Sequence, residues 1–427
     1  MNQYERMLQK LETPEAIARL KYLYGDRDGM LLTQCARYTQ MIKRHEAAYA
    51  SERPVMLVSA PGRTEIGGNH TDHNRGCVLA AAVNLDTLAA VSARDDLLVH
   101  VRSEGYRPME LDLSDLTMRK SELGTTAGLI RGVAAGMAQA GLKIGGFDAV
   151  ITSTVASGSG LSSSAAFEVM VTGILDQLYN GFTMDYKLRA KIGQYAENVY
   201  FGKPSGLLDQ MASAAGGLVN VDFRDDDPAV FPMGYDFAAR GYALVVVGTG
   251  GSHADLTDDY AAIPAEMKKV AAFFHEPYLR SVRPEEFTRA IPQLRKTVSD
   301  RAILRSLHFY EENDRVSRQV SALKDDRLED FLREIIASGR SSYMYLQNVY
   351  ARVSDQSLCL ALALAERRLE GKGAWRIHGG GFAGTTLNFV PQAELAAFVA
   401  EMEACFGAGC CHVLDIRPEG AAVLDLN

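Results

Sequence analysis

The sequence has no uninterrupted apolar run of the roughly 18 residues that a membrane-spanning helix needs. Its first residues carry charges throughout and lack the apolar stretch of a secretory signal peptide. A cationic excess is also missing, because 53 Asp and Glu residues outnumber 45 Lys and Arg residues and give a formal net charge of −8. Proteins that bind nucleic acid by neutralising its phosphates need the opposite balance. We therefore expect a cytoplasmic protein whose partners include neither a membrane nor a nucleic acid.

Cysteines at metal-ligand spacing are missing as well. The chain has six cysteines, and two of them, Cys410 and Cys411, are adjacent, which suits neither a zinc knuckle nor a redox pair. We interpret all six as reduced thiols. With 47% hydrophobic and 23% charged residues, the 427-residue chain has the composition of a globular protein of two or three domains.

The patterns along the chain mix helices and strands without a strict βαβ alternation, which favours an α+β fold. Helices are predicted for residues 1–50, for 124–141, after the Gly/Ser run near residue 160, and over charged stretches within 261–371. Strands are predicted for residues 55–63, 77–96 with a break near Asn84, 97–104, 145–155 and 242–250, and for both sides of a glycine turn near residue 380.

The first segment with chemical potential is ASGSGLSSSAAF, residues 156–167. Its glycines let backbone N–H groups approach an anion, its serines add hydroxyls, and the helix that follows presents unpaired N–H groups. These properties are typical of a phosphate-binding loop, although no Lys follows the glycines as in a Walker A loop. The alternative is a Ser/Gly turn that caps a core helix.

The second segment, residues 59–76, crowds Arg, Glu, Asn, His and Asp into a glycine-rich stretch after a strand. His70, Asp72 and His73 suggest a metal site, but no further His or Cys lies at a suitable spacing. Hydrogen bonding to a sugar explains the same residues better.

Two further segments are ambiguous when each is taken alone. Asp209 follows a Pro-Ser-Gly turn and is explained equally well as a helix cap, and Glu197 as a surface residue. Gly379, Gly381 and Gly384 match the GxGxxG pattern, but a strand follows them, whereas a dinucleotide fingerprint must open a helix. A glycine hairpin, or a backbone that approaches a ligand closely, fits better.

In combination and in order, these segments resemble the GHMP kinases, and the galactokinases in particular. APGR (60–63) with HTD (70–72), GSGLSSSAA (158–166), PSGLLDQ (204–210) and GGGFAG (379–384) match the family motifs over roughly residue 55 to the C-terminus. The four ordered motifs together are specific, whereas each alone is weak.

The resemblance implies two α+β domains, 1–222 with the phosphate loop and sugar signature and 223–427 with the third motif, and an active site in the cleft between them. It implies ATP and Mg²⁺ as cofactors and a sugar phosphorylated at its anomeric (C1) hydroxyl, with galactose or a close relative as the acceptor. The implied catalytic residues are Asp209 and Arg63, and the implied Mg²⁺ ligands are Ser164 and Glu197. The implied sugar contacts are Asn69, His70, Asp72, Gly206 and Tyr260. The implied nucleotide contacts are Gly158, Ser159, Gly160, Leu161, Ser162, Ser163 and Ser164.

The sequence departs from the galactokinase signature at several positions. The family pattern Asn-Leu-Ile-Gly-Glu before HTDY is replaced here by Glu65-Ile66-Gly67-Gly68-Asn69 before HTDH. Asn69 therefore stands where the family has a glutamate that contacts the C6 hydroxyl of the sugar. Ser252-His253 replaces an Arg-His pair, and about thirty extra residues precede the first motif.

The change to Asn69 leaves the acceptor open. Because a carboxylate only accepts hydrogen bonds whereas a neutral amide also donates them, a C6-modified sugar such as galacturonate is an alternative to galactose. Two other classes remain: a GHMP kinase for a non-sugar alcohol such as mevalonate or homoserine, and a catalytically silent paralogue that binds sugar and ATP as a sensor. The sequence gives no indication of the oligomeric state.

Overall fold

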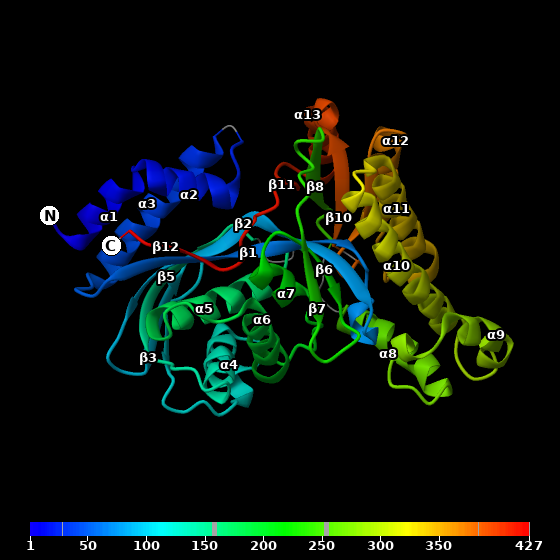
Figure 1. Ribbon diagram of the computed structural model, residues 1–427, viewed down its shortest axis with the longest axis horizontal. Coiled ribbons are helices and arrows are strands. Elements are labelled where there is room, and N and C mark those ends of the chain that lie inside the picture. The colour runs from blue at the N-terminus through cyan, green and yellow to red at the C-terminus, as the bar shows by residue number, and fades with distance from the viewer. Residues whose placement is uncertain (28, 156–159, 252–255, 383, 427) are drawn as a thin grey trace.

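The computed structural model describes residues 1–27, 29–155, 160–251, 256–382 and 384–426 (Figure 1). Within them, eight strands form a first sheet in the order β12-β1-β2-β5-β3-β4, with β6 paired to β2 and β7 to β6. These strands are β1 (Val55–Gly67), β2 (Cys77–Ala93), β3 (Leu98–Ser103), β4 (Met109–Asp112), β5 (Phe147–Ser153), β6 (Leu218–Asp222), β7 (Ala229–Met233) and β12 (Ala422–Leu424).

A second sheet of four described strands follows the order β11-β8-β10-β9 and is antiparallel throughout. Its strands are β8 (Tyr242–Gly248), β9 (Ala374–His378), β10 (Thr385–Pro391) and β11 (Cys411–Leu414). Strands β9 and β10 lie on either side of the glycine turn, as the sequence predicts. Among the described residues no helix combines the length and the apolar character that crossing a membrane requires.

Helices cover both faces of the first sheet. Below it in Figure 1 lie α4 (Thr126–Gln139), α5 (Ser163–Tyr179), α6 (Tyr186–Tyr195) and α7 (Leu208–Ala215). The short turns η2 (Lys120–Glu122) and η3 (Ala196–Phe201) contact α4. Above it lie α1 (Gln3–Leu11), α2 (Pro14–Tyr24) and α3 (Met30–Tyr49), the helices predicted for residues 1–50.

The N-terminal helices are fastened by a buried ionic cluster. Asp86 on β2 pairs with Arg37 of α3 at 2.5 Å and with Arg417 of the C-terminal segment at 3.0 Å. Tyr24 of α2 donates to the same carboxylate at 2.5 Å. Two cations and a hydroxyl compensate for burying this charge, so that the additional N-terminal residues form part of the folded core.

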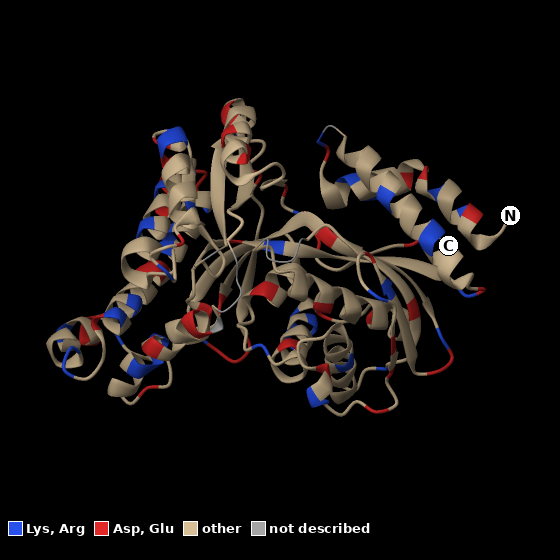
Figure 2. Cartoon of the chain, turned by 180° about the vertical axis from the view of Figure 1, so that it is seen from behind, with Lys and Arg blue, Asp and Glu red and all other residues tan. Residues whose placement is uncertain are grey.

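The remaining helices surround the second sheet and form an extended helical arm beside it. They are α8 (Thr257–Phe273), α9 (Pro284–Leu294), α10 (Asp300–Lys324), α11 (Leu328–Ser341), α12 (Ser357–Leu369) and α13 (Leu395–Phe406), with η1 (Asp72–Asn74), η4 (Leu279–Ser281), η5 (Ser342–Leu346) and η6 (Gln392–Glu394) as short turns. Figure 2 shows acidic and basic residues interspersed along the long helices of this arm.

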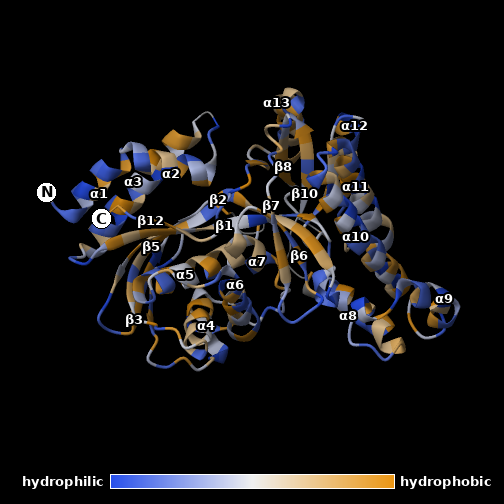
Figure 3. Cartoon of the chain, in the orientation of Figure 1, coloured by the Kyte–Doolittle hydropathy of each residue, from blue (hydrophilic) through white to orange (hydrophobic). Residues whose placement is uncertain are grey.

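Apolar residues concentrate on the sheet strands and on the helix faces that cover them (Figure 3). One apolar cluster joins the two sheets, because Ile66 and Leu79 of the first pack with Val246, Leu387 and Phe331 of the second sheet and α11. The first sheet also takes in β7 and β12, which follow residue 222. The predicted domains 1–222 and 223–427 therefore share the first sheet and one apolar cluster. The boundary at residue 222 stays a prediction.

The predicted break near Asn84 is wrong, because β2 runs without interruption from Cys77 to Ala93. The pairing of β2 with β1 shifts register at this place, between Pro61–Asp86 and Arg63–Ala82. Proline cannot donate to the ladder, and the register shift marks a bulge here. Arg63 is the first residue of β1 that pairs with β2 again after this bulge.

Candidate active site

Arg63 and Asp209 form an ion pair at the centre of the candidate site. Nε of Arg63 donates to Oδ1 of Asp209 at 2.8 Å, and Nη2 lies 2.7 Å from the same oxygen. The second carboxylate oxygen, Oδ2, accepts from the hydroxyl of Ser162. Burial alone would raise the pKa of Asp209, but the charge of Arg63 and the hydrogen bonds from Ser162 and Arg63 outweigh it and hold this pKa below its usual value.

Arg63 also holds the serine-rich loop. Its Nη1 donates to the carbonyl of Gly160 at 2.5 Å, and its backbone N–H donates to the carbonyl of Leu161 at 3.0 Å. Gly160 has a φ of +73° and Ser162 a φ of +61°, so the chain turns sharply before α5 begins at Ser163. The first N–H groups of α5 are thereby placed beside Asp209, where an anion would find donors. Gly158 and Ser159 lie outside the described residues.

Glu197 is the centre of a second polar cluster and lies on η3, a π-helical turn of the kind that often marks functional sites. Its Oε1 accepts from the hydroxyl of Ser164 at 2.8 Å and lies 3.0 Å from Nζ of Lys203. Its Oε2 accepts from Ser205 at 2.6 Å and from Gln210 at 2.8 Å. With 2% of its side chain exposed, Glu197 is a buried carboxylate surrounded by donors from three elements.

Ser164 and Glu197 supply the hydroxyl and carboxylate oxygens that Mg²⁺ prefers. The described residues contain no group of three or more His, Cys, Asp or Glu that could hold a metal by themselves. A two-ligand site of this type fits Mg²⁺ that is shared with the phosphates of a nucleotide, because Mg²⁺ usually keeps several waters and substrate oxygens.

Glu168 is a buried acid that the sequence analysis missed. It follows Ser164 by one helical turn on α5, and its Oε2 accepts from Gln210 at 2.9 Å. Burial, reinforced by the nearby charge of Glu197, raises its pKa well above the usual value. The i, i+4 spacing from Ser164 is the signal in the sequence that points to it.

The sugar signature meets the glycine turn of the second sheet. His70 adopts a φ of +57°, and its Nε2–H donates to the carbonyl of Gly380 at 3.0 Å. Burial lowers the pKa of His70 to about 4, so the ring is neutral. Tyr260 donates to the carbonyl of Gly381 at 2.9 Å and packs edge-on against Phe382.

Asp72 and Gly206 lie in direct contact although they come from different motifs. A Cβ built on Gly206 would collide with Oδ2 of Asp72, so only glycine lets the two segments approach this closely. Oδ1 of Asp72 accepts from the backbone N–H of His73 at 2.9 Å. The structure thus brings together three of the implied sugar contacts, His70, Asp72 and Gly206, with Tyr260 behind the glycine turn.

The comparisons with known proteins agree with this assembly. The galactokinase galactose-binding signature matches residues 43–93, and the GHMP kinase N-terminal domain matches residues 128–217. A galactokinase of Streptomyces coelicolor is 34% identical over 373 residues, which cover 86% of this chain and 92% of the relative. This protein belongs to the galactokinase family.

Solved structures show the same fold. The galactokinase of Lactococcus lactis in complex with galactose superimposes with a TM-score of 0.79 at 23% identity, covering 91% of this chain and 99% of that one. The mevalonate kinase of Methanococcus jannaschii has a TM-score of 0.60 at 12% identity, covering 88% and 98%. The α+β fold of the GHMP kinases is therefore confirmed.

Within the galactokinase signature, the exchanged pair Glu65 and Asn69 is in contact. Nδ2 of Asn69 donates to Oε1 of Glu65 at 2.9 Å and to the carbonyl of Gly379 at 2.7 Å. Its Oδ1 accepts from Asn348 at 2.9 Å and from Ser342 at 3.3 Å. Asn69 is fully buried, and both donors and both acceptor positions of its amide are used within the protein.

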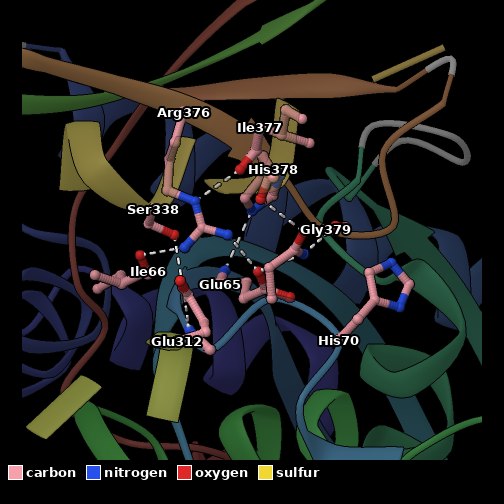
Figure 4. Close-up of polar contacts among 12 residues, drawn as sticks. Glu65, Ile66, His70, Glu312, Ser338, Arg376, Ile377, His378 and Gly379 are labelled. Atoms are coloured by element: carbon pink, nitrogen blue, oxygen red, sulfur yellow. Dashed lines mark hydrogen bonds and ion pairs between the residues drawn. The ribbon is translucent and has the colours of Figure 1, made fainter. Parts of the chain in front are cut away.

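Arg376 balances the charge of Glu65 in the galactokinase fold (Figure 4). The two side chains are both buried and 2.7 Å apart, and Arg376 also donates to the carbonyls of Ile66 at 2.5 Å and Ile377 at 2.8 Å. Figure 4 shows Arg376 at the centre of this network and the ring of His70 directed away from it. The first and third motifs are thereby linked by an ion pair with little access to water.

His378 is a second residue missed by the motif analysis. Its Nε2 accepts from the backbone N–H of Glu65 at 3.2 Å, so its Nδ1–H donates to Thr385 at 3.0 Å. Burial, together with the charges of Arg63 and Arg376, lowers the pKa of His378 well below its usual value. A neutral imidazole thus fixes β1 to the second sheet two residues from Arg63.

Proposed function

We propose that the protein is an ATP-dependent galactokinase that transfers the γ-phosphoryl group to the anomeric hydroxyl of galactose. The arrangement of Arg63, Asp209 and Ser162 carries this proposal. It combines an ionised carboxylate, a fixed guanidinium and a helix N-terminus, which are the positioning and charge-neutralising groups that phosphoryl transfer requires.

In this proposal Asp209 orients the attacking hydroxyl and receives its proton. Its carboxylate is ionised and its side chain is 28% exposed, so one end of the ion pair is open to a substrate. Arg63 reaches Gly160 of the phosphate loop as well as Asp209, so a single guanidinium lies between the acceptor and the phosphate donor. This guanidinium would stabilise the negative charge that develops on the transferring phosphoryl group.

The remaining roles follow from the same geometry. Gly160 through Ser164, with Gly158 and Ser159, would hold the phosphates of ATP. Ser164 and Glu197 would hold Mg²⁺, which supplies charge neutralisation between the β- and γ-phosphates. His70, Asp72, Gly206 and Tyr260 would line the sugar side, and the two lobes would enclose the substrates.

A C6-modified hexose such as galacturonate is the second candidate acceptor. It is favoured because the family glutamate is replaced by the neutral Asn69 and the relocated carboxylate of Glu65 is already paired with Arg376. Neither side chain then offers a free negative charge that would repel an acidic C6 group.

A coupled ADP-release assay with Mg-ATP tests the proposal across galactose, galacturonate, glucuronate, glucose and N-acetylgalactosamine. Galactose should give the highest kcat/KM, and Asp209→Asn should abolish sugar-dependent turnover while the fold is retained. Preference for galacturonate would establish the second candidate, and absence of any sugar-dependent turnover would contradict both.

A further inference from the structure

Lys203 is a cation in the candidate site to which no role has been assigned. It lies in the segment between η3 and α7, directly before Pro204, and its Nζ is 3.0 Å from Oε1 of Glu197. Its side chain is 58% exposed, whereas that of Glu197 is 2% exposed. The ammonium group therefore covers the open side of a buried carboxylate and has solvent behind it.

Glu197 contacts this ammonium, and the carboxyl groups of Asp209 and Glu168 lie near enough to act on it electrostatically. Burial lowers the pKa of Lys203, but the charge of Glu197 and its hydrogen bond, followed by the charges of Asp209 and Glu168, outweigh it and raise the pKa overall. Burial raises the pKa of Asp209, and Lys203 helps to lower it, after the larger effects of Arg63 and Ser162. Lys203 is thus charged and lies within electrostatic reach of the catalytic carboxylate.

Lys203 and Ser164 contact the same oxygen of Glu197. Oε1 of Glu197 accepts from both Ser164 and Lys203, so a cation coordinated by Ser164 and Glu197 must approach this same oxygen. Two cations at one carboxylate oxygen repel each other, and the lysine can move because its stem is flexible and its end is exposed. Lys203 would therefore leave Glu197 when Ser164 and Glu197 hold a metal ion.

We propose that Lys203 is a phosphate-binding residue that would exchange its contact with Glu197 for the phosphate oxygens of the nucleotide when Ser164 and Glu197 hold Mg²⁺. This inference rests on the proposed kinase function. The released ammonium finds a compact anionic partner in the phosphates, which lysine binds as a point charge. In this exchange a cation lies beside Glu197 both before and after Mg²⁺ and the nucleotide bind, so the charge of the site stays balanced.

The variant Lys203→Met, the conservative variant Lys203→Arg and the control Lys191→Met test this inference. Lys191 is 40% exposed and pairs with Asp227 at 2.9 Å on the surface of α6, so the control removes an ion-paired lysine outside the site. Binding of Mn²⁺ to the nucleotide-free protein is measured by electron paramagnetic resonance. Binding of a non-hydrolysable ATP analogue with Mg²⁺ is measured by calorimetry.

Lys203→Met should bind Mn²⁺ several-fold more tightly, because the competing ammonium is gone, and the Mg-nucleotide about tenfold more weakly. Lys203→Arg should keep most of the nucleotide affinity, and Lys191→Met should match the parent in both assays. Unchanged nucleotide affinity in Lys203→Met would overturn the role of Lys203 while leaving the kinase function intact. A parent protein that binds no nucleotide would overturn both proposals.

Discussion

Arg63 and Asp209 are 146 residues apart in the chain, yet Nε of Arg63 donates to the Asp209 carboxylate at 2.8 Å. Arg63 lies beside the register shift between β1 and β2, and Asp209 lies in the first turn of α7. Because Arg63 also donates to Gly160, this contact joins three of the four sequence motifs.

Removing the charge of Arg63 should change the pH dependence of catalysis. In Arg63→Met, burial would act on Asp209 with less opposition and raise its pKa. We expect the acidic limb of the kcat profile to move to higher pH and kcat to fall by about a hundred- to a thousandfold. Arg63→Lys keeps the charge and should keep the acidic limb low. An unshifted limb in Arg63→Met would contradict this account of Asp209.

The contact between Gly206 and Asp72 should be sensitive to a single methyl group. Gly206→Ala would displace the Asp72 carboxylate and lower kcat/KM for the sugar by roughly tenfold to a hundredfold, with little change in the KM for ATP. Gly234→Ala is the matched control, since a Cβ at Gly234 meets no atom within 4 Å. Steady-state kinetics with each substrate varied in turn distinguish the two effects; equal losses for both substrates would argue against a sugar-side role.

The buried ion pair of Glu65 and Arg376, which links the first and third motifs, should contribute strongly to the free energy of unfolding. Arg376→Met leaves an uncompensated buried carboxylate and should lower the free energy of unfolding by about 3–5 kcal/mol. Adding Glu65→Gln should recover part of the loss. The exposed Arg340, 3.8 Å from Glu366, is the control, and its change to Met should cost less than about 1 kcal/mol. Urea unfolding measures all of these variants, and similar losses for Arg376→Met and Arg340→Met would refute the claim.

Restoring the family order at positions 65 and 69 should alter acceptor choice. The single change Asn69→Glu places a second carboxylate in the buried network with one guanidinium, and should destabilise the protein by about 3 kcal/mol. The double change Glu65→Asn/Asn69→Glu keeps one carboxylate and should recover stability.

In that double variant the ratio of kcat/KM for galactose to that for galacturonate should rise, because a carboxylate at position 69 repels an acidic C6 group. Glu65→Asn alone removes a carboxylate without adding one and should leave the ratio near the parent value. A ratio that does not respond to the double exchange would show that position 69 does not influence the C6 end.

The sequence was sufficient for elements whose signal is local. The Gly/Ser run before α5, the helices of residues 1–50 and the strand–turn–strand around Gly380 were all predicted, because glycine positions and apolar periodicity determine them. The break predicted near Asn84 was wrong. The pairing of β2 with β1 changes register here, opposite Pro61, and in the sequence of β2 alone this irregularity resembles the end of a strand.

Interactions between distant residues were beyond the sequence. The motif pattern singled out Asn69 but gave no indication that its amide is consumed by Glu65, Gly379, Asn348 and Ser342. Lys203 and Glu168 escaped notice for a related reason. Their importance comes from the nearby charge of Glu197, which only the folded chain places beside them.

The most direct test of the central claim is identification of the product by ³¹P and ¹H nuclear magnetic resonance after incubation with galactose and Mg-ATP. We expect stoichiometric ADP and galactose phosphorylated on its anomeric oxygen, with neither formed by Asp209→Asn. ADP release that does not depend on galactose, or a phosphate on any other hydroxyl, would contradict the assignment of Asp209 and Arg63 to an anomeric sugar kinase.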